Sequence, residues 1–222
     1  TRDAYNGEAL INFSLAPHAP YTVSDATFKR IVTLAEQIDL PIHIHIHETL
    51  DEIKQSLTQY NLRPLARLQN LGLLGPNLIA VHAVHLEQNE IDILAKLGCH
   101  IAHCPASNLK LASGIAPIAQ MLDAGLNVGI GTDGAASNNK LDMFDEMRLT
   151  ALLAKGTSGR ADVLPAHQAL QMATLNAAKA IGLQNQIGSL VAGKAADMIA
   201  VDLATIQTAP CYDVISHLVY AA

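Results

Sequence analysis

The chain has 222 residues, half of them apolar, and a formal net charge of −6 from 14 basic and 20 acidic side chains. Such a chain can bury a large core, and its few, scattered basic residues argue against a nucleic-acid partner. No apolar run is long enough to span a bilayer and no signal-peptide pattern opens the sequence. We therefore expect a soluble, cytoplasmic protein with no membrane partner.

Apolar, strand-like runs alternate along the chain with helix-like segments, which is typical of β/α units around a parallel sheet. Strands are expected at residues 10–16, 41–48, 78–85, 99–103 and 127–132. Helices are expected from an N-cap at Ser24 through Ala35, at 49–59, 64–71, 87–97, 141–154 and 165–181, and in a segment ending at Ala124, with a loop at 106–114.

Within residues 41–49, isoleucine and histidine alternate from position 42 to position 47, just before Glu48. Alternation along a strand places His43, His45 and His47 on one face and the isoleucines on the other. Imidazole is the commonest protein ligand for divalent metals and the usual proton carrier near neutral pH. The row therefore indicates either a reactive site or a half-exposed strand whose histidines face water.

Polar residues recur at the ends of all five expected strands. In order they are His18, His45 with Glu48, His82, His103 and Asp133. In parallel α/β folds, side chains that follow the carboxyl ends of the strands gather at one edge of the sheet. A local hydrogen bond or helix cap explains each residue alone, but the repetition favours a metal-assisted site at the mouth of a β/α barrel.

Five short segments follow one another in a recognisable order. They are Ala16–Thr22 (APHAPYT), His45–Thr49 (HIHET), His82–Leu86 (HAVHL), His103–Leu111 (HCPASNLKL) and Gly131–Gly134 (GTDG). In this order they resemble the amidohydrolase superfamily, and within it the branch of 5-methylthioadenosine/S-adenosylhomocysteine deaminases and the related triazine chlorohydrolases.

The resemblance implies an α/β fold, namely the C-terminal part of a (β/α)8 metal-dependent hydrolase barrel together with part of a small β domain. Residues 1–185 would supply barrel strands four to eight with their helices, and residues 186–222 part of the small domain. Because a complete barrel needs roughly 250 residues, we expect a missing N-terminal segment of the same enzyme as a partner. A second copy of the chain as a further partner is left open.

The resemblance also implies a metal site and a set of catalytic residues. His45 and Asp133 would bind one divalent metal, zinc in the first instance, with iron as the alternative. Asp133 would also accept the proton of the nucleophilic water, Glu48 would shuttle protons, and His82 would polarise the water or the substrate.

For substrate binding the resemblance implies His18, Glu48 and Ser137, with a small nucleoside-like molecule as the ligand. His43 is expected either to pack internally or to support the metal-binding residues from behind, and Asn108 to shape the loop in which it lies.

The implied reaction is hydrolytic deamination of a purine-type ring, as in 5-methylthioadenosine, S-adenosylhomocysteine or an adenosine-like compound. Coordination lowers the pKa of metal-bound water from about 15.7 towards 7, and the resulting hydroxide would attack the ring carbon and release ammonia. The same site in a chlorohydrolase, or in a deaminase of guanine or another cyclic amidine, is an alternative. A non-catalytic homologue is another, because the His-Xaa-His pair of the family's first strand has no counterpart here.

Overall fold

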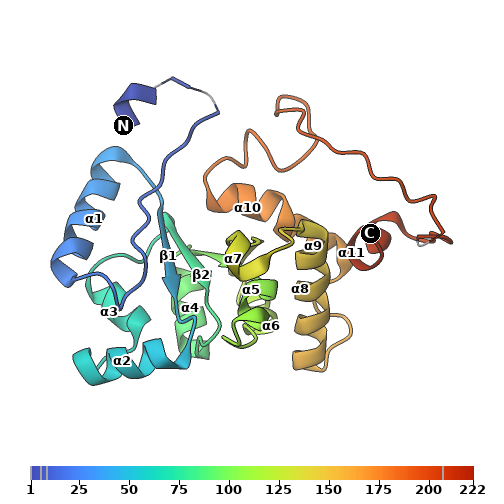
Figure 1. The fold of residues 1–222 in the computed structure, drawn as a ribbon. Coiled ribbons are helices and arrows are strands. Elements are labelled where there is room, and N and C mark those ends of the chain that lie inside the picture. Colours follow the sequence, from blue (N-terminus) through green and yellow to red (C-terminus); the bar gives the residue numbers. More distant parts are fainter. Residues whose placement is uncertain (1, 6, 9, 207) are drawn as a thin grey trace.

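A computed structural model describes residues 2–5, 7–8, 10–206 and 208–222. Its centre is a parallel sheet of four strands in chain order (Figure 1). The strands are β1 (Ile42–Ile46), β2 (Leu78–His82), β3 (His100–His103) and β4 (Asn127–Ile130). Parallel neighbours need crossover connections, and helices provide each of them, which is the β/α arrangement that the sequence predicts.

The helices follow the strands in regular alternation. A short 3-10 helix, η1 (Arg2–Tyr5), and α1 (Asp25–Ile38) precede β1; α2 (Leu50–Tyr60) and α3 (Pro64–Asn70) lead to β2; α4 (Gln88–Lys96) leads to β3; α5 (Pro105–Lys110) and α6 (Ile118–Asp123) lead to β4; and α7 (Ala135–Asn138), α8 (Met143–Ser158), α9 (Ala166–Ala173), α10 (Leu175–Ala180) and α11 (Val214–Tyr220) follow it. None of the helices that the structure describes is long and apolar enough to cross a membrane.

Side-chain caps set the start of the helices beside β1. The hydroxyl of Ser24 accepts a hydrogen bond from the main-chain N–H of Thr27 at 3.3 Å, which confirms the predicted N-cap of α1. Thr49 caps α2 in the same way, accepting from the N–H of Glu52 at 3.2 Å. Each cap satisfies an N–H group that the helix itself leaves without a partner.

The alternation in β1 divides the sheet into an apolar and a polar face. Ile42, Ile44 and Ile46 are at most 4% exposed and belong to the main core, whereas His43 is exposed and His45 half-buried. Burying each isoleucine contributes roughly 1.5–3 kcal/mol, so this face sets the register of the strand. His45 is thereby held on the face opposite the core.

The segment 10–16 does not form the full strand that the sequence predicts. Only Leu15 pairs with the sheet, through a parallel bridge to Ile42 in which the N–H of His43 donates to the carbonyl of Leu15 at 2.8 Å. Leu10 is 97% exposed, so its apolar side chain gains nothing from strand formation. The segment therefore follows the β1 edge of the sheet without extending it.

Two helical predictions also need correction. The expected loop at 106–114 begins as α5, because Pro105 at the first helical position has a backbone angle already suited to a helix. The expected single helix at 165–181 is divided into α9 and α10 at Thr174, where φ is −128° and ψ is −90°.

The predicted strand at 78–85 ends early, at His82. Both His82 (φ 69°) and Ala83 (φ 49°) adopt left-handed backbone conformations, which a strand cannot accommodate. The turn that follows leaves His85 off the sheet, although its N–H still donates to the carbonyl of His47 at 3.0 Å.

Residues 186–222 were expected to contribute β structure, but those that the structure describes form no strand. Leu190, Val191 and Ile199 are 60–77% exposed, since no neighbouring strand is present to cover them. The segment extends away from α10 before the chain returns and packs α11 against α8 and α9 (Figure 1). A domain boundary after residue 185 stays a prediction.

Candidate functional site

The carboxyl ends of β1, β2 and β4 bring four of the predicted site residues together. The imidazole rings of His45 and His82 stack with their centroids 5.3 Å apart, and His82 Nε2 lies 3.8 Å from Glu48 Oε2. His45 and Asp133 line the same cavity, of about 270 Å³. His45 and Asp133 are 88 positions apart in the sequence, and the order of the strands in the sheet brings them to the same site.

The orientation of His45 is fixed by the segment that runs along the sheet edge. His45 Nδ1 lies 2.5 Å from the main-chain carbonyl oxygen of His18, and the same oxygen accepts the main-chain N–H of His45 at 3.2 Å. A carbonyl oxygen can only accept, so Nδ1 carries the proton and Nε2 keeps a lone pair. This is the tautomer in which an imidazole can bind a metal through Nε2.

Asp133 is held as an anion by surrounding hydrogen-bond donors. The hydroxyls of Ser107 and Ser137 both donate to Oδ2 at 2.6 Å, and the N–H of Gly134 donates to Oδ1 at 2.7 Å. Burial alone would raise the pKa of Asp133, but these three bonds, aided by nearby His82, lower it below its ordinary value. The carboxylate is therefore ionised at neutral pH, as a metal ligand must be.

Glu48 reaches the same place from the first turn after β1. Its Oε1 accepts a hydrogen bond from the hydroxyl of Ser113 at 3.2 Å, while Oε2 faces His82 Nε2. Its side chain is 21% exposed, so water or a ligand can reach it. An accessible carboxylate beside an imidazole is suited to moving protons.

His82 is oriented by an amide that the sequence did not assign to the site. Its Nδ1 lies 2.8 Å from Asn108 Oδ1, and both side chains are at most 2% exposed. Since the amide oxygen accepts, Nδ1 carries a proton, and Nε2 lies on the side of Glu48. Asn108, which was expected only to shape its loop, is in this structure the partner of His82.

His47 does not lie on the face of His43 and His45, contrary to the prediction from alternation. Its φ of 54° turns the chain, and the ring is fully buried with Nε2 accepting from the N–H of Leu65 at 3.1 Å. Burial lowers the pKa of His47 to about 4, so the ring is neutral. His43 does line the cavity of His45, but it is exposed and not an internal packing group.

Three further predicted residues lie at or near the site. The ring of His18 is 5.1 Å from that of His45 and meets the ring of Tyr21 edge-on at 5.8 Å. Ser137 is engaged with Asp133, as described above. His103 is buried, and neither ring nitrogen has a hydrogen-bond partner among the residues described; burial lowers its pKa to about 3 and keeps it neutral.

The sequence did not indicate Ser107 or Ser113 as site residues, and it did not identify Asn108 as the partner of His82. Their partners are 26 to 65 residues away in the chain. The only local signal is their position just after the strand end at His103, where the start of α5 turns Ser107 and Asn108 back towards the sheet.

His45 and Asp133 are the residues that fit a metal ion. A free imidazole lone pair and an ionised carboxylate are ligands that Zn²⁺ accepts. In the parts of the chain with assigned structure, no three histidine, cysteine, aspartate or glutamate side chains converge to hold an ion. The two residues therefore fit as a portion of a metal site.

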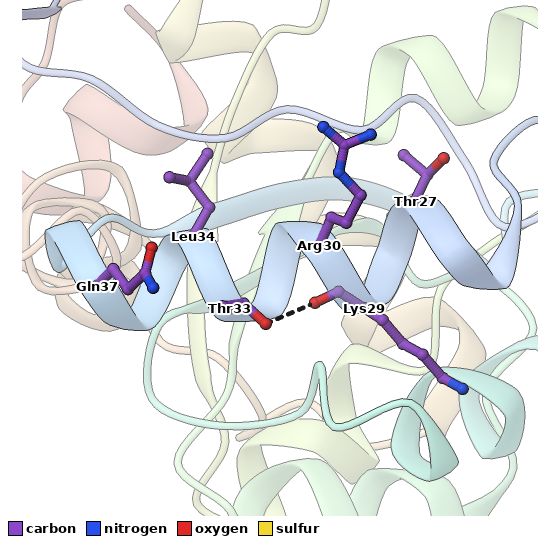
Figure 2. Close-up of a pocket in the computed structure, with 6 residues that line it drawn as sticks. All are labelled: Thr27, Lys29, Arg30, Thr33, Leu34 and Gln37. Carbon is purple, nitrogen blue, oxygen red and sulfur yellow. Dashed lines mark hydrogen bonds between the residues drawn. The ribbon is translucent and has the colours of Figure 1, made fainter.

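Another hollow lies on the solvent side of α1 (Figure 2). It is lined by six exposed residues of this one helix, namely Thr27, Lys29, Arg30, Thr33, Leu34 and Gln37. The Thr33 hydroxyl donates to the carbonyl of Lys29, as it would on any exposed helix. The hollow gathers no residues from the strand ends, and we assign no chemistry to it.

Comparison with known proteins places these residues in context. The profile of the amidohydrolase family matches residues 3–222. A 5-methylthioadenosine/S-adenosylhomocysteine deaminase from Saccharophagus degradans is 50% identical over 217 residues, which are 98% of this chain and 49% of the relative. One of the same name from Moorella thermoacetica is 51% identical over 97% of this chain and 50% of its own length. The chain thus spans about half the length of these relatives.

Two solved structures have the same fold as this chain over nearly its whole length. A zinc-bound adenosine deaminase from Xanthomonas campestris superimposes with a TM-score of 0.98 at 49% identity, covering all of this chain and 50% of that one. A zinc-complexed atrazine chlorohydrolase from Arthrobacter aurescens superimposes with a TM-score of 0.88 at 30% identity, covering 94% of this chain and 46% of that one.

Proposed function

Because the chain belongs to the amidohydrolase family, we propose that it carries the C-terminal part of the active site of a hydrolytic deaminase. The substrate would be a purine-type ring in 5-methylthioadenosine, S-adenosylhomocysteine or an adenosine-like nucleoside. The observation that carries the proposal is the convergence of Glu48, His82, His45 and Asp133 at the strand ends. The names of the relatives support the choice of reaction and substrate class.

His45 Nε2 and the carboxylate of Asp133 would hold one divalent ion, with zinc supported by the zinc-bound neighbours. Further ligands would come from outside this chain. When bound, such an ion supplies Lewis-acid chemistry that lowers the pKa of a coordinated water from about 15.7 to about 7.

The chain's own residues would move the protons. Among the residues that the structure describes, one main-chain N–H donates to Asp133 Oδ1, so this oxygen retains lone-pair capacity to take a proton from the attacking water. His82 Nε2 would accept a hydrogen bond from that water and polarise it. Glu48 Oε2 would take one proton of the water and pass it to the ring nitrogen while the water oxygen bonds to the ring carbon. Asp133 would take the other proton and pass it to the amino group, which leaves as ammonia as its bond to the ring carbon breaks.

Two residues would contact the substrate. The His18 ring lies beside His45, next to the cavity, and its edge contact with Tyr21 leaves a face for a ligand. Ser137 already donates its hydroxyl proton to Asp133, so a substrate contact would use the acceptor lone pairs of its oxygen.

A triazine chlorohydrolase is the second candidate, supported by the structural similarity to the atrazine chlorohydrolase. It would use the same residues with chloride as the leaving group. A third candidate, a non-catalytic homologue, would bind no metal.

The experiment uses the natural full-length protein and measures its metal content and the release of ammonia or chloride. The panel contains 5-methylthioadenosine, S-adenosylhomocysteine, adenosine, guanine and a chlorotriazine. Ammonia from the adenosine derivatives is the expected result. Chloride release from the triazine alone would favour the second candidate, and absence of stoichiometric zinc or iron would favour the third.

Glu48→Gln should keep the metal and lose turnover by about 10²- to 10⁴-fold, because the amide cannot carry the proton to the ring. The measurements are metal content and kcat, with Glu36→Gln on the exposed face of α1 as a control that leaves both unchanged. Wild-type turnover in Glu48→Gln would disprove the assignment of Glu48 as the proton carrier.

A further inference from the structure

Glu52, at the third position of α2, uses both carboxylate oxygens on the turn that presents Glu48. Oε1 accepts the main-chain N–H of His47 at 3.0 Å, and Oε2 accepts the main-chain N–H of Glu48 at 2.9 Å. The residue is only 4% exposed. One side chain therefore holds two consecutive peptide groups just beyond the end of β1.

This turn needs such a partner. His47 has a φ of 54°, a left-handed conformation that is uncommon for residues other than glycine and persists only when the surroundings enforce it. The sheet occupies the carbonyl groups here, since the N–H of Ala83 donates to Ile46 and that of His85 donates to His47. The N–H groups of His47 and Glu48 would be left without partners if Glu52 were removed.

The turn decides where two side chains go. It sends the ring of His47 into the protein, where the N–H of Leu65 binds it, and directs the carboxylate of Glu48 towards His82 and Ser113. A rotation about the His47–Glu48 peptide would move the Glu48 carboxylate away from both contacts.

Capping α2 does not by itself require a buried carboxylate at this position. Thr49 already provides the side-chain cap of the helix. Burial raises the pKa of Glu52 to about 7, although three backbone hydrogen bonds act in the opposite direction, and the nearby Glu48 carboxylate raises it further. Placing a second carboxylate so close to Glu48 is unfavourable, which indicates a task beyond helix stability.

We propose that Glu52 is a positioning residue, which fixes the peptide turn at His47 and Glu48 and so aims the Glu48 carboxylate at the reacting ring. This inference rests on the proposed role of Glu48 in proton transfer. It assigns to Glu52 no contact with the substrate or the metal.

The kinetic test is Glu52→Gln in the full-length protein. A glutamine offers one acceptor oxygen and turns an NH₂ group towards the second N–H, so the double contact is lost at nearly constant volume. We expect kcat to fall about 10²-fold, as displacements near 1 Å do, with KM and bound zinc unchanged. A wild-type kcat in Glu52→Gln would overturn the proposal.

Ser56→Ala is the stability control. Ser56 lies on the same helix as Glu52, is 6% exposed, and donates its hydroxyl proton to the carbonyl of Leu62 at 2.8 Å, away from the His47 and Glu48 peptides. It should lower the melting temperature and leave kcat unchanged. An equal loss of kcat in both variants would show that Glu52 acts only by stabilising the fold, and it would overturn the proposal.

A measurement on the wild-type protein covers the case in which Glu52→Gln fails to fold. The backbone amide signals of His47 and Glu48, followed by NMR against pH, should shift together with one midpoint near pH 7. Independent or absent shifts would overturn the proposal. This result does not depend on turnover, so it separates failure of the Glu52 contact from failure of the proposed reaction.

Discussion

At the scale of single residues, Glu52 and His47 are joined by a hydrogen bond of 3.0 Å from the His47 N–H to Glu52 Oε1, and their pKa values shift in opposite directions. Burial raises the pKa of Glu52 from 4.5 to about 7 and lowers that of His47 from 6.5 to about 4. Between pH 4.5 and 7 the folded state holds the Glu52 proton more tightly than the unfolded chain does, so this residue makes the protein less stable as the pH rises. His47 acts oppositely, since its contribution is present above pH 6.5 and is lost as the pH falls towards 4.

The Glu52 effect can be isolated by comparing wild type with Glu52→Gln. The difference between their free energies of unfolding, wild type minus variant, should fall by about 3 kcal/mol between pH 4.5 and pH 7 and then level off. Urea unfolding at a series of pH values measures it, and His47 cancels because it is present in both proteins. A difference that does not change with pH would show that Glu52 is not protonated preferentially in the folded state.

The residues that follow strand ends could be anticipated because strand alternation and chain order are local properties. The structure brings together four residues that the sequence places after strand ends, namely His45, Glu48, His82 and Asp133. Their supporting partners could not be anticipated. Asn108 meets His82 only because α5 starts immediately after β3, a packing result that no local pattern records.

At the scale of elements, backbone geometry at the strand ends accounts for two errors of prediction, the length of the strand expected at 78–85 and the side-chain direction of His47. His47, His82 and Asp133 all have positive φ angles, between 54° and 69°. Such residues end a strand earlier than its apolar pattern suggests and reverse the expected side-chain direction, as at His47. The helix starts were easier to predict because Ser24 and Thr49 act through bonds within four residues.

The cap of α1 gives a direct test at this scale. Ser24→Ala should lower the free energy of unfolding by about 1 kcal/mol, because an N–H of the first turn loses its partner while Phe28 must remain buried. Urea unfolding at neutral pH measures the loss. Thr33→Ala, on the exposed face of the same helix (Figure 2), should cost nothing, and an equal loss there would contradict the capping interpretation.

At the scale of the whole molecule, the parallel four-stranded sheet and its helices follow from the alternating pattern of the sequence. The segment at 10–16 and the region 186–222 do not follow from it, since both were expected to pair with a sheet. Apolar alternation reports a preference for pairing, but a strand also requires a neighbour with free N–H and C=O groups. This is why the side chains of Leu10 and Ile199 lie exposed.

Metal removal tests whether metal binding at this site stabilises the fold. Chelation of the full-length protein should lower its melting temperature, because an ion that binds only the folded state adds about 2.7 kcal/mol at a hundred times its Kd. Zinc should restore the loss in wild type and in His167→Ala, an exposed site on α9, but not in His45→Ala. Full restoration in His45→Ala would exclude His45 as a ligand.

The pairing of His82 with Asn108 has a consequence for which ligands can bind beside Glu48. When His82 is neutral, its proton lies on Nδ1 and the electron pair of Nε2 faces Glu48 Oε2, so two acceptors face each other across 3.8 Å. A group that offers an N–H or O–H satisfies both of them, whereas a carbonyl oxygen is repelled by both. The pair of His82 and Glu48 would therefore discriminate between ligands by hydrogen-bond polarity before any reaction begins.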